Sequence, residues 1–171
     1  MALQNLYVIF LIDRAGLVGN DGGTHHGVFD LAFLNCIPNM TIFTPANEEE
    51  LASIITNKPT AIKGPVAIRY PRGKGSKMEI VHAKNSYKTI LPLKTGDKKA
   101  VLSIGGICNT VAQSLNQTTE QLAHYALQQV KPLPEQILKE IFTKHAYIYI
   151  VEDGVKSGGI CQSILSWANE N

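Results

Sequence analysis

A glycine-rich loop flanked by two apolar segments constrains this chain more than any other feature of its sequence. The loop spans residues 12–30, contains five glycines, and carries an arginine, aspartates and two adjacent histidines. Glycine lets a backbone turn tightly and approach a ligand closely, because it has no Cβ and adopts positive φ at little cost. Such a loop on a rigid frame is a common place for binding and catalysis, although a simple connecting loop is the alternative.

An apolar run precedes this loop. Residues 6–12 read Leu-Tyr-Val-Ile-Phe-Leu-Ile, a run rich in β-branched and aromatic side chains. This pattern predicts a strand covered on both faces, at the centre of a parallel sheet. The loop leaves the carboxyl end of that strand, where open α/β sheets bind their ligands.

The rest of the chain alternates between strand and helix patterns, which predicts an α/β fold. Strands are expected at residues 41–43, within 64–73, and at 100–104, 124–130 and 146–151. Helices are expected at residues 28–34, after 47, after 134 and after 160.

The helix after residue 47 has two candidate starts. Asn47 with Glu50 three residues later resembles a capping arrangement, whereas Thr44 before Pro45 is a rival cap. Three apolar residues at helical spacing are expected to form its buried stripe: Leu51, Ile54 and Ile55.

The composition becomes polar and lysine-rich between residues 74 and 99. Such a stretch has little apolar mass to bury and predicts an interdomain linker, with short extended pieces. We therefore expect a partial parallel-sheet domain in residues 1–73, a linker in 74–99, and a small α/β domain in 100–171. A chain of 171 residues that is 44% hydrophobic can form two such cores.

Charge and cysteine content exclude several classes. The formal net charge is only +2 and no Lys/Arg block stands out, which argues against nucleic-acid and anionic-membrane binding. Cys36, Cys108 and Cys161 lie far apart without metal-ligand spacing, so we expect reduced, mostly buried thiols in a cytoplasmic protein. The apolar run at residues 6–12 is too short for a membrane span and lacks the basic start of a secretory signal.

The order of residues in the loop is more specific than its composition. Asp-Arg-Ala-Gly-Leu-Val-Gly at residues 13–19, followed by Asp-Gly, Thr-His-His-Gly and Phe-Asp-Leu, closely resembles 1-deoxy-D-xylulose-5-phosphate synthase. That family is a thiamine-diphosphate-dependent relative of transketolase. Arg-Tyr-Pro-Arg-Gly at residues 69–73 is similar to the end of its pyrimidine-binding domain. Val-Lys-Pro-Leu and Val-Glu-Asp-Gly, followed by Gly-Gly, resemble the transketolase C-terminal domain.

The resemblance implies a reaction and a set of site residues. The family condenses pyruvate with glyceraldehyde 3-phosphate and releases carbon dioxide, in the pathway to isoprenoid precursors and thiamine. Arg14 and Arg72 match its arginines for the phosphate of the aldehyde substrate, and guanidinium groups suit bidentate phosphate binding. His25 matches its proton-transfer histidine and Asp21 its catalytic aspartate. The resemblance leaves the role of Arg69 open.

The resemblance assigns no function to other positions in the same loop. His26 is given no role, and Gly23 replaces the proline expected in the family. A metal site formed by Asp21, His25 and His26 is disfavoured, because adjacent histidines point differently and no fourth ligand is suitably spaced.

A second glycine pair lies at the start of the C-terminal domain. Gly105 and Gly106 before a helix could bind a phosphate on free backbone amides, but a strand-to-helix turn is favoured.

Several family motifs are missing before Leu6. These are the Gly-Asp-Gly motif for the diphosphate and Mg²⁺, the glutamate that activates thiamine diphosphate, and the aromatic residue that stacks on its pyrimidine. The resemblance therefore implies a C-terminal fragment or truncated homologue, inactive alone, that binds a phosphorylated aldehyde. Its expected partner is a second copy in a homodimer or a missing N-terminal half. A noncatalytic dimerisation module and one subunit of a split enzyme are the alternatives.

Overall fold

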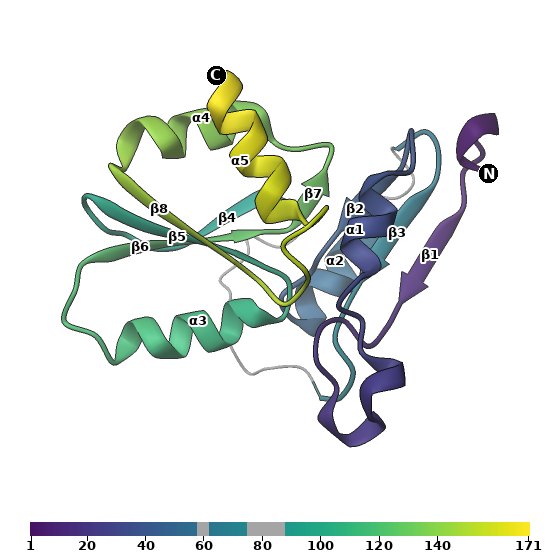
Figure 1. The fold of residues 1–171 in the computed structure, drawn as a ribbon, viewed down its shortest axis with the longest axis horizontal. Helices are drawn as coiled ribbons and strands as arrows, with labels where there is room; N and C mark the ends of the chain where they lie inside the picture. The colour runs from purple at the N-terminus through teal and green to yellow at the C-terminus, as the bar shows by residue number, and fades with distance from the viewer. Residues whose placement is uncertain (58–61, 75–87) are drawn as a thin grey trace.

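The computed structural model describes residues 1–57, 62–74 and 88–171. The chain forms two four-stranded sheets with helices packed against them, which confirms the α/β class (Figure 1). Short 3₁₀ turns complete the fold at Ala2–Gln4, Gly19–Asp21 and Gly23–His25. The last two lie in the glycine-rich loop.

The first sheet has the strand order β1-β3-β2-β7. Strands β1 (Ile9–Ile12), β2 (Thr41–Phe43) and β3 (Val66–Arg69) are parallel, and β7 (Gln129–Lys131) is antiparallel to β2. Helices α1 (Asp30–Asn35) and α2 (Glu48–Asn57) pack on opposite faces of this sheet. Successive side chains of a strand point to opposite faces, which is why β2 and β3 contribute to both packing layers.

Strand β1 differs from its prediction. It pairs with β3 alone in the described part of the chain, at the edge of the sheet, and Ile9, Phe10 and Leu11 are 39%, 38% and 55% exposed. The expectation of a central strand covered on both faces was therefore wrong for this chain. A continuous apolar run shows that a strand has apolar side chains to bury on both faces. Whether they are buried depends on the neighbouring elements, which the run does not specify.

The second sheet has the order β4-β6-β5-β8. Its strands are β4 (Ile90–Lys94), β5 (Lys99–Ile104), β6 (Leu122–Leu127) and β8 (Tyr147–Glu152), of which only β4 is antiparallel to its neighbour among the described pairings. Helix α3 (Ile107–Asn116) covers one face, and α4 (Glu135–Lys144) and α5 (Ile160–Glu170) cover the other (Figure 1). In the segment expected to be a linker, residues 75–87 lie outside the described residues and Ile90–Lys94 forms β4.

Strand β7 joins the two sheets, because it follows β6 of the second sheet directly and pairs with β2 of the first. Beside this pairing, Thr44 donates from its backbone N to the carbonyl of Gln128 at 2.8 Å and from its hydroxyl to that of Leu127 at 2.9 Å. The Lys131 ammonium donates to the carbonyls of Asn35 and Ile37 at the end of α1. The two sheets are therefore connected by backbone pairing and by side chains.

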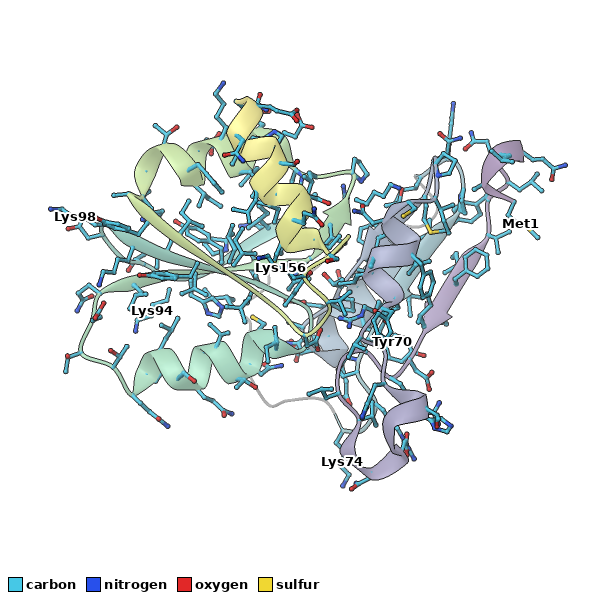
Figure 2. The ribbon with its side chains drawn as sticks, in the orientation of Figure 1. Met1, Tyr70, Lys74, Lys94, Lys98 and Lys156 are labelled. Carbon is cyan, nitrogen blue, oxygen red and sulfur yellow. The ribbon has the colours of Figure 1, made fainter. Side chains whose placement is uncertain are left out.

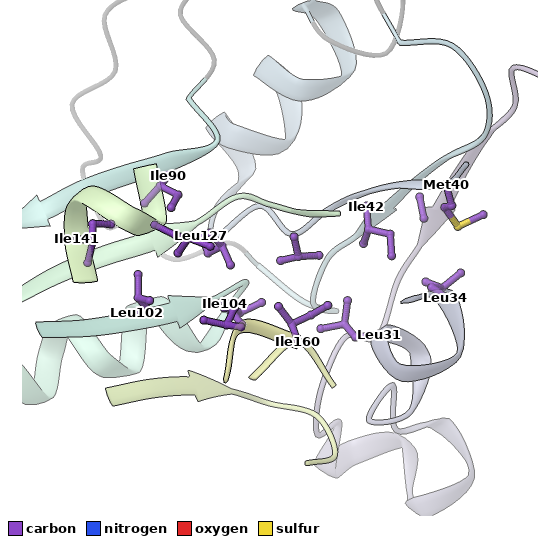
Figure 3. Packing of buried hydrophobic residues seen from close by; sticks show 14 residues of the cluster. Leu31, Leu34, Met40, Ile42, Ile90, Leu102, Ile104, Leu127, Ile141 and Ile160 are labelled. Carbon is purple, nitrogen blue, oxygen red and sulfur yellow. The ribbon is translucent and has the colours of Figure 1, made fainter. Parts of the chain in front are cut away.

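One apolar cluster runs through both units (Figure 3). Leu31 and Ile42 from the first unit share it with Leu102, Ile104 and Ile160 from the second, and all five are at most 1% exposed. Burial of such side chains contributes about 1.5–3 kcal/mol each. The shared core fixes the position of the first sheet relative to the second.

Helix α2 begins with the cap formed by Asn47, whose Oδ1 accepts from the Glu50 N at 2.8 Å. Ile54 is fully buried and Leu51 partly buried, as expected for the apolar stripe. Ile55 is 42% exposed, so its assignment to the buried stripe was wrong. It directly follows Ile54, and one residue further along a helix turns the side chain by about 100°, away from the sheet.

The three cysteines are free thiols: Cys36 is exposed, Cys108 buried and Cys161 half-buried. Burial raises the pKa of the Cys108 and Cys161 thiols to about 12, which keeps both protonated at neutral pH. The expectation of mostly buried thiols is wrong for Cys36. No helix within the described residues is long and apolar enough to cross a membrane.

Candidate functional site

Three of the four site residues selected from the sequence lie together at the surface of the protein: Arg14, Asp21 and Arg72. The Arg14 Nε lies 2.9 Å from Oδ2 of Asp21, and the Arg72 guanidinium pairs with the other oxygen of the same carboxylate. Arg14 also pairs with Asp13 at 3.2 Å. The side chains of Arg14 and Arg72 are 35% and 48% exposed, whereas that of Asp21 is 13% exposed. Two guanidinium groups thus hold one carboxylate and still face solvent.

Backbone hydrogen bonds explain why these residues meet. The Ala15 N donates to the Tyr70 carbonyl at 3.1 Å, which brings the start of the loop beside the residues that follow β3. The Gly27 N donates to the carbonyls of Arg14 and Gly16, both at 3.0 Å, and so closes the base of the loop. A Cβ at Gly27 would lie 2.3 Å from the Arg14 carbonyl oxygen, so the close approach requires glycine.

Arg14 itself has an unusual backbone. Its φ is +59°, in the left-handed region that residues other than glycine rarely adopt. Such conformations cost about 1–3 kcal/mol and gather at functional sites, where the surrounding structure holds them. The loop closure at Gly27 is the constraint that holds this one.

The two histidines of the loop have separate contacts. The Nδ1 of the exposed His25 lies 3.0 Å from the Thr24 hydroxyl, and no hydrogen bond within the described residues links this ring to the three charged groups. The His26 Nδ1 accepts from the Val18 N at 2.9 Å, across the loop. Sequence reasoning gave His26 no role; its observed contact is structural, because it ties the two arms of the loop together.

A cavity of about 660 Å³ opens beside the charged cluster. It lies among the residues after β3, the starts of α2 and α3, and the end of β8, with Arg72, Lys74, Asn109 and Asp153 among its polar lining. Figure 2 labels Tyr70 and Lys74, which mark the course of the chain from β3 toward the loop. The cavity therefore shares Arg72 with the cluster and reaches residues of both units.

Arg69, whose role the sequence left open, forms buried ion pairs with two aspartates. Its side chain is 0% exposed and donates to Oδ2 of Asp30 at 2.8 Å, Oδ1 of Asp153 at 2.7 Å and the carbonyl of Gly27 at 2.8 Å. The carboxylates of Asp153 and Asp30 raise the pKa of Arg69, against the effect of burial. The sequence feature that could have predicted these contacts is the arginine at the end of the apolar strand Val-Ala-Ile-Arg, because a buried charge needs partners.

The described residues offer no metal site. No group of three or more His, Cys, Asp or Glu side chains in residues 1–57, 62–74 and 88–171 could hold a metal ion. The alternative of a metal on Asp21, His25 and His26 thus has no support from the geometry.

The second glycine pair forms a turn between β5 and α3. Gly105 has a φ of +71°, and its carbonyl accepts from the Cys108 N at 3.0 Å. Gly106 lines the cavity beside the charged cluster. The geometry agrees with turn chemistry as the reason for this pair.

The sequence of this chain is similar to known proteins. Residues 1–77 match the family described as transketolase, pyrimidine binding domain. Over 180 residues the chain is 44% identical to 1-deoxy-D-xylulose-5-phosphate synthase of Parabacteroides distasonis, covering 100% of this chain and 28% of that protein. Over 181 residues it is 42% identical to the synthase of Bacteroides fragilis, covering 100% and 27%.

A solved structure is similar in fold. A protein described as a split gene transketolase, in an inactive beta4 tetramer, superposes with a TM-score of 0.84 at 22% sequence identity, covering 100% of this chain and 56% of that one. The chain spans just over a quarter of the length of the synthases that it matches. The chain thus has an α/β fold similar to that of a transketolase, residues 1–77 match the pyrimidine-binding domain family, and the whole length is similar to part of 1-deoxy-D-xylulose-5-phosphate synthase.

Proposed function

We propose that this chain is a C-terminal portion of a 1-deoxy-D-xylulose-5-phosphate synthase and carries the half of the active site that holds the phosphorylated aldehyde. The observation that carries the proposal is the convergence of Arg14 and Arg72 on Asp21, beside a cavity. Two partly exposed guanidinium groups that already hold a carboxylate are suited to bind a phosphate in bidentate fashion. Glyceraldehyde 3-phosphate is the ligand that we assign to them.

His25 and Asp21 are assigned to proton transfer. The Thr24 hydroxyl lies beside Nδ1 of His25, so Nε2 is the ring nitrogen that would give a proton to the oxygen of the aldehyde as the new bond forms. Asp21 holds the two arginines until the phosphate takes its place. Its carboxylate would then be free to act on a proton of the substrate.

The cofactor would come from outside the described residues. Thiamine diphosphate supplies the carbanion chemistry in this family. On this proposal the diphosphate and Mg²⁺ are held by another part of the polypeptide or by another subunit. On this proposal the chain binds the aldehyde and does not turn over by itself.

The exposed edge of the first sheet supports the need for a partner. Strand β1 leaves apolar side chains and a row of backbone groups uncovered on the described chain. An edge of this kind pairs readily with another strand. The partner that we assign is the part of the synthase that this chain does not cover, either in the same polypeptide or, as in a split enzyme, in a separate one.

Calorimetric titration of the purified chain tests the proposal. Glyceraldehyde 3-phosphate and inorganic phosphate should bind, and Arg14→Ala or Arg72→Ala should weaken binding by about tenfold to 100-fold. Lys99→Ala is the matched control, because it removes one exposed cation, paired with Glu120, from the second sheet. Absence of phosphate binding by the folded chain would overturn the substrate assignment. Tight binding of thiamine diphosphate and Mg²⁺ would overturn the assignment to a half-site.

A noncatalytic dimerisation module is the second candidate, favoured by the same exposed β1 edge. If self-association through this edge is the function, Leu11→Lys should convert dimers to monomers in sedimentation measurements. For such a module we expect no phosphate binding by the unmodified chain, so Arg14→Ala would have no binding to lose. The two candidates are therefore separated by one titration and one sedimentation experiment.

A further inference from the structure

We propose that Asp153, acting through Arg69, is a positioning residue for the loop that carries Arg14, Asp21 and His25. The inference rests on the proposed function and adds a role for the second unit in the same site. Asp153 lies at the end of β8, far from the loop in sequence, and it also lines the cavity beside Arg72.

The Arg69 guanidinium connects three separate segments. Its Nε pairs with Asp30 at the start of α1, its Nη1 with Asp153 after β8, and its Nη2 with the carbonyl of Gly27 in the loop. The planar guanidinium fixes the directions of all three contacts at once. The position of Gly27 relative to the second unit is therefore set by one buried side chain.

Gly27 passes this constraint to the site. Its N donates to the carbonyls of Arg14 and Gly16, and its carbonyl accepts from the Gly16 N at 3.0 Å as well as from Arg69. Arg14, which is held at positive φ, is thus one hydrogen bond away from the residue that Arg69 fixes. A shift of Gly27 would move the backbone that carries the phosphate-binding guanidinium.

Asp153 also meets the other arm of the loop. A Cβ at Gly16 would lie 2.3 Å from the Asp153 Oδ2, so this carboxylate occupies the space next to the glycine backbone. On the other arm of the loop, the Val28 carbonyl accepts from the Val155 N at 3.1 Å. The segment after β8 therefore contacts both arms of the loop base, one through Gly16 and one through Val28.

The charge of Asp153 is needed as well as its shape. Arg69 is fully buried, and two carboxylates compensate its charge. With one carboxylate removed, the guanidinium is less well compensated and its contact with Gly27 is no longer fixed from the side of the second unit. Asp153→Asn keeps the size of the side chain, removes the charge and replaces one acceptor oxygen by an NH₂ group.

Amide hydrogen exchange on the full 171-residue chain tests the inference directly. We expect Asp153→Asn to accelerate exchange in residues 14–28 by about tenfold, with α4 unchanged, because exchange reports local opening. Gly16→Ala disturbs the same contact from the loop side and should give the same local pattern. Unchanged exchange in residues 14–28 would overturn the inference, as would equal acceleration throughout the chain.

Binding of inorganic phosphate provides the second measurement. Asp153→Asn should weaken it by about tenfold, because a displaced binding group loses much of its effect. Ile141→Val in α4 is the control for general destabilisation, and it should leave both phosphate affinity and loop exchange unchanged. An equal loss of affinity in the control overturns the positioning role. If the unmodified chain binds no phosphate, the proposed function fails, and hydrogen exchange alone decides the role of Asp153.

Discussion

Two clusters in this molecule pair arginine guanidinium groups with aspartate carboxylates, one in the buried interior and one at the surface. Arg69 is fully buried, and its guanidinium is satisfied by Asp30, Asp153 and a backbone carbonyl. Arg14 and Arg72 are partly exposed and share Asp21 at the surface, beside a cavity. All three contacts of the first cluster are internal, whereas the second is the one that we propose exchanges its carboxylate for a phosphate.

Burial, more than residue type, separates the structural ion pair of Arg69 from the proposed binding site. A buried ion pair loses much of its stabilisation to desolvation, so its partners must all be in place. An exposed pair contributes little to stability and remains available to solvent and ligands. The following experiments test that division, from the largest expected effect to the smallest.

Arg69→Ala should have the largest effect on stability. Its removal leaves the buried carboxylate of Asp30 without a cation, and breaking a buried pair costs about 3–5 kcal/mol. Chemical denaturation of the variant and the unmodified chain measures this difference in unfolding free energy. A loss below about 1 kcal/mol would mean that the buried cluster behaves like an exposed one.

Glu50 provides a buried carboxylate that is held by a backbone amide and an uncharged side chain instead of a guanidinium. Burial raises its pKa from 4.5 to about 6, although hydrogen bonds from the Ala46 N and the Gln128 side chain act in the other direction. The folded state therefore holds the proton more tightly than the unfolded state. The free energy of unfolding should fall by about 2 kcal/mol in total as the pH rises from well below 4.5 to well above about 6.

Urea denaturation over this pH range measures the effect, and Glu50→Gln is the matched variant. Because glutamine does not titrate, the fall should be absent from the variant, while contributions from other groups remain. Identical pH profiles for the two proteins would refute the assignment to Glu50.

Arg72→Ala should leave stability almost unchanged, because exposed ion pairs contribute about 0–1 kcal/mol. The same variant should lose phosphate affinity, as proposed above, so the two properties should separate. Thermal unfolding and calorimetric titration on one preparation measure both. A stability loss as large as that of Arg69→Ala would remove the distinction between the clusters.

Asp21→Asn should give the smallest change in stability, a few tenths of a kcal/mol. Neutralising this carboxylate frees both arginines from an internal anion, so inorganic phosphate should bind a few-fold more tightly. Titration at fixed ionic strength measures the change, because salt screens these partly exposed charges. Weaker phosphate binding would indicate that Asp21 orients the arginines more than it competes for them.

The sequence predicted much of the local structure. The residue pattern located the strands at residues 41–43 and 100–104. The sequence offered Asn47 and Thr44 as rival caps for α2, and the structure has Asn47. Strand β1 was found, but its burial was overestimated, because an apolar run does not state which neighbour covers it.

For the candidate site, the loop motif identified Arg14 and Asp21, the segment at residues 69–73 identified Arg72, and the fold brings these three together. The motif did not identify Arg69, Asp30 and Asp153 as one cluster. These residues lie on different elements, and no local spacing relates them. Their meeting depends on the packing of the second unit against the first.

The sequence by itself determined the α/β pattern, the loop composition and the residue types available for phosphate binding. These follow from side-chain periodicity, glycine content and charge, all of which act over a few residues. Only the tertiary structure decided that Arg69 is buried while Arg14 and Arg72 face solvent. The same guanidinium becomes structural or available for binding according to the solvent and partners that distant segments leave around it.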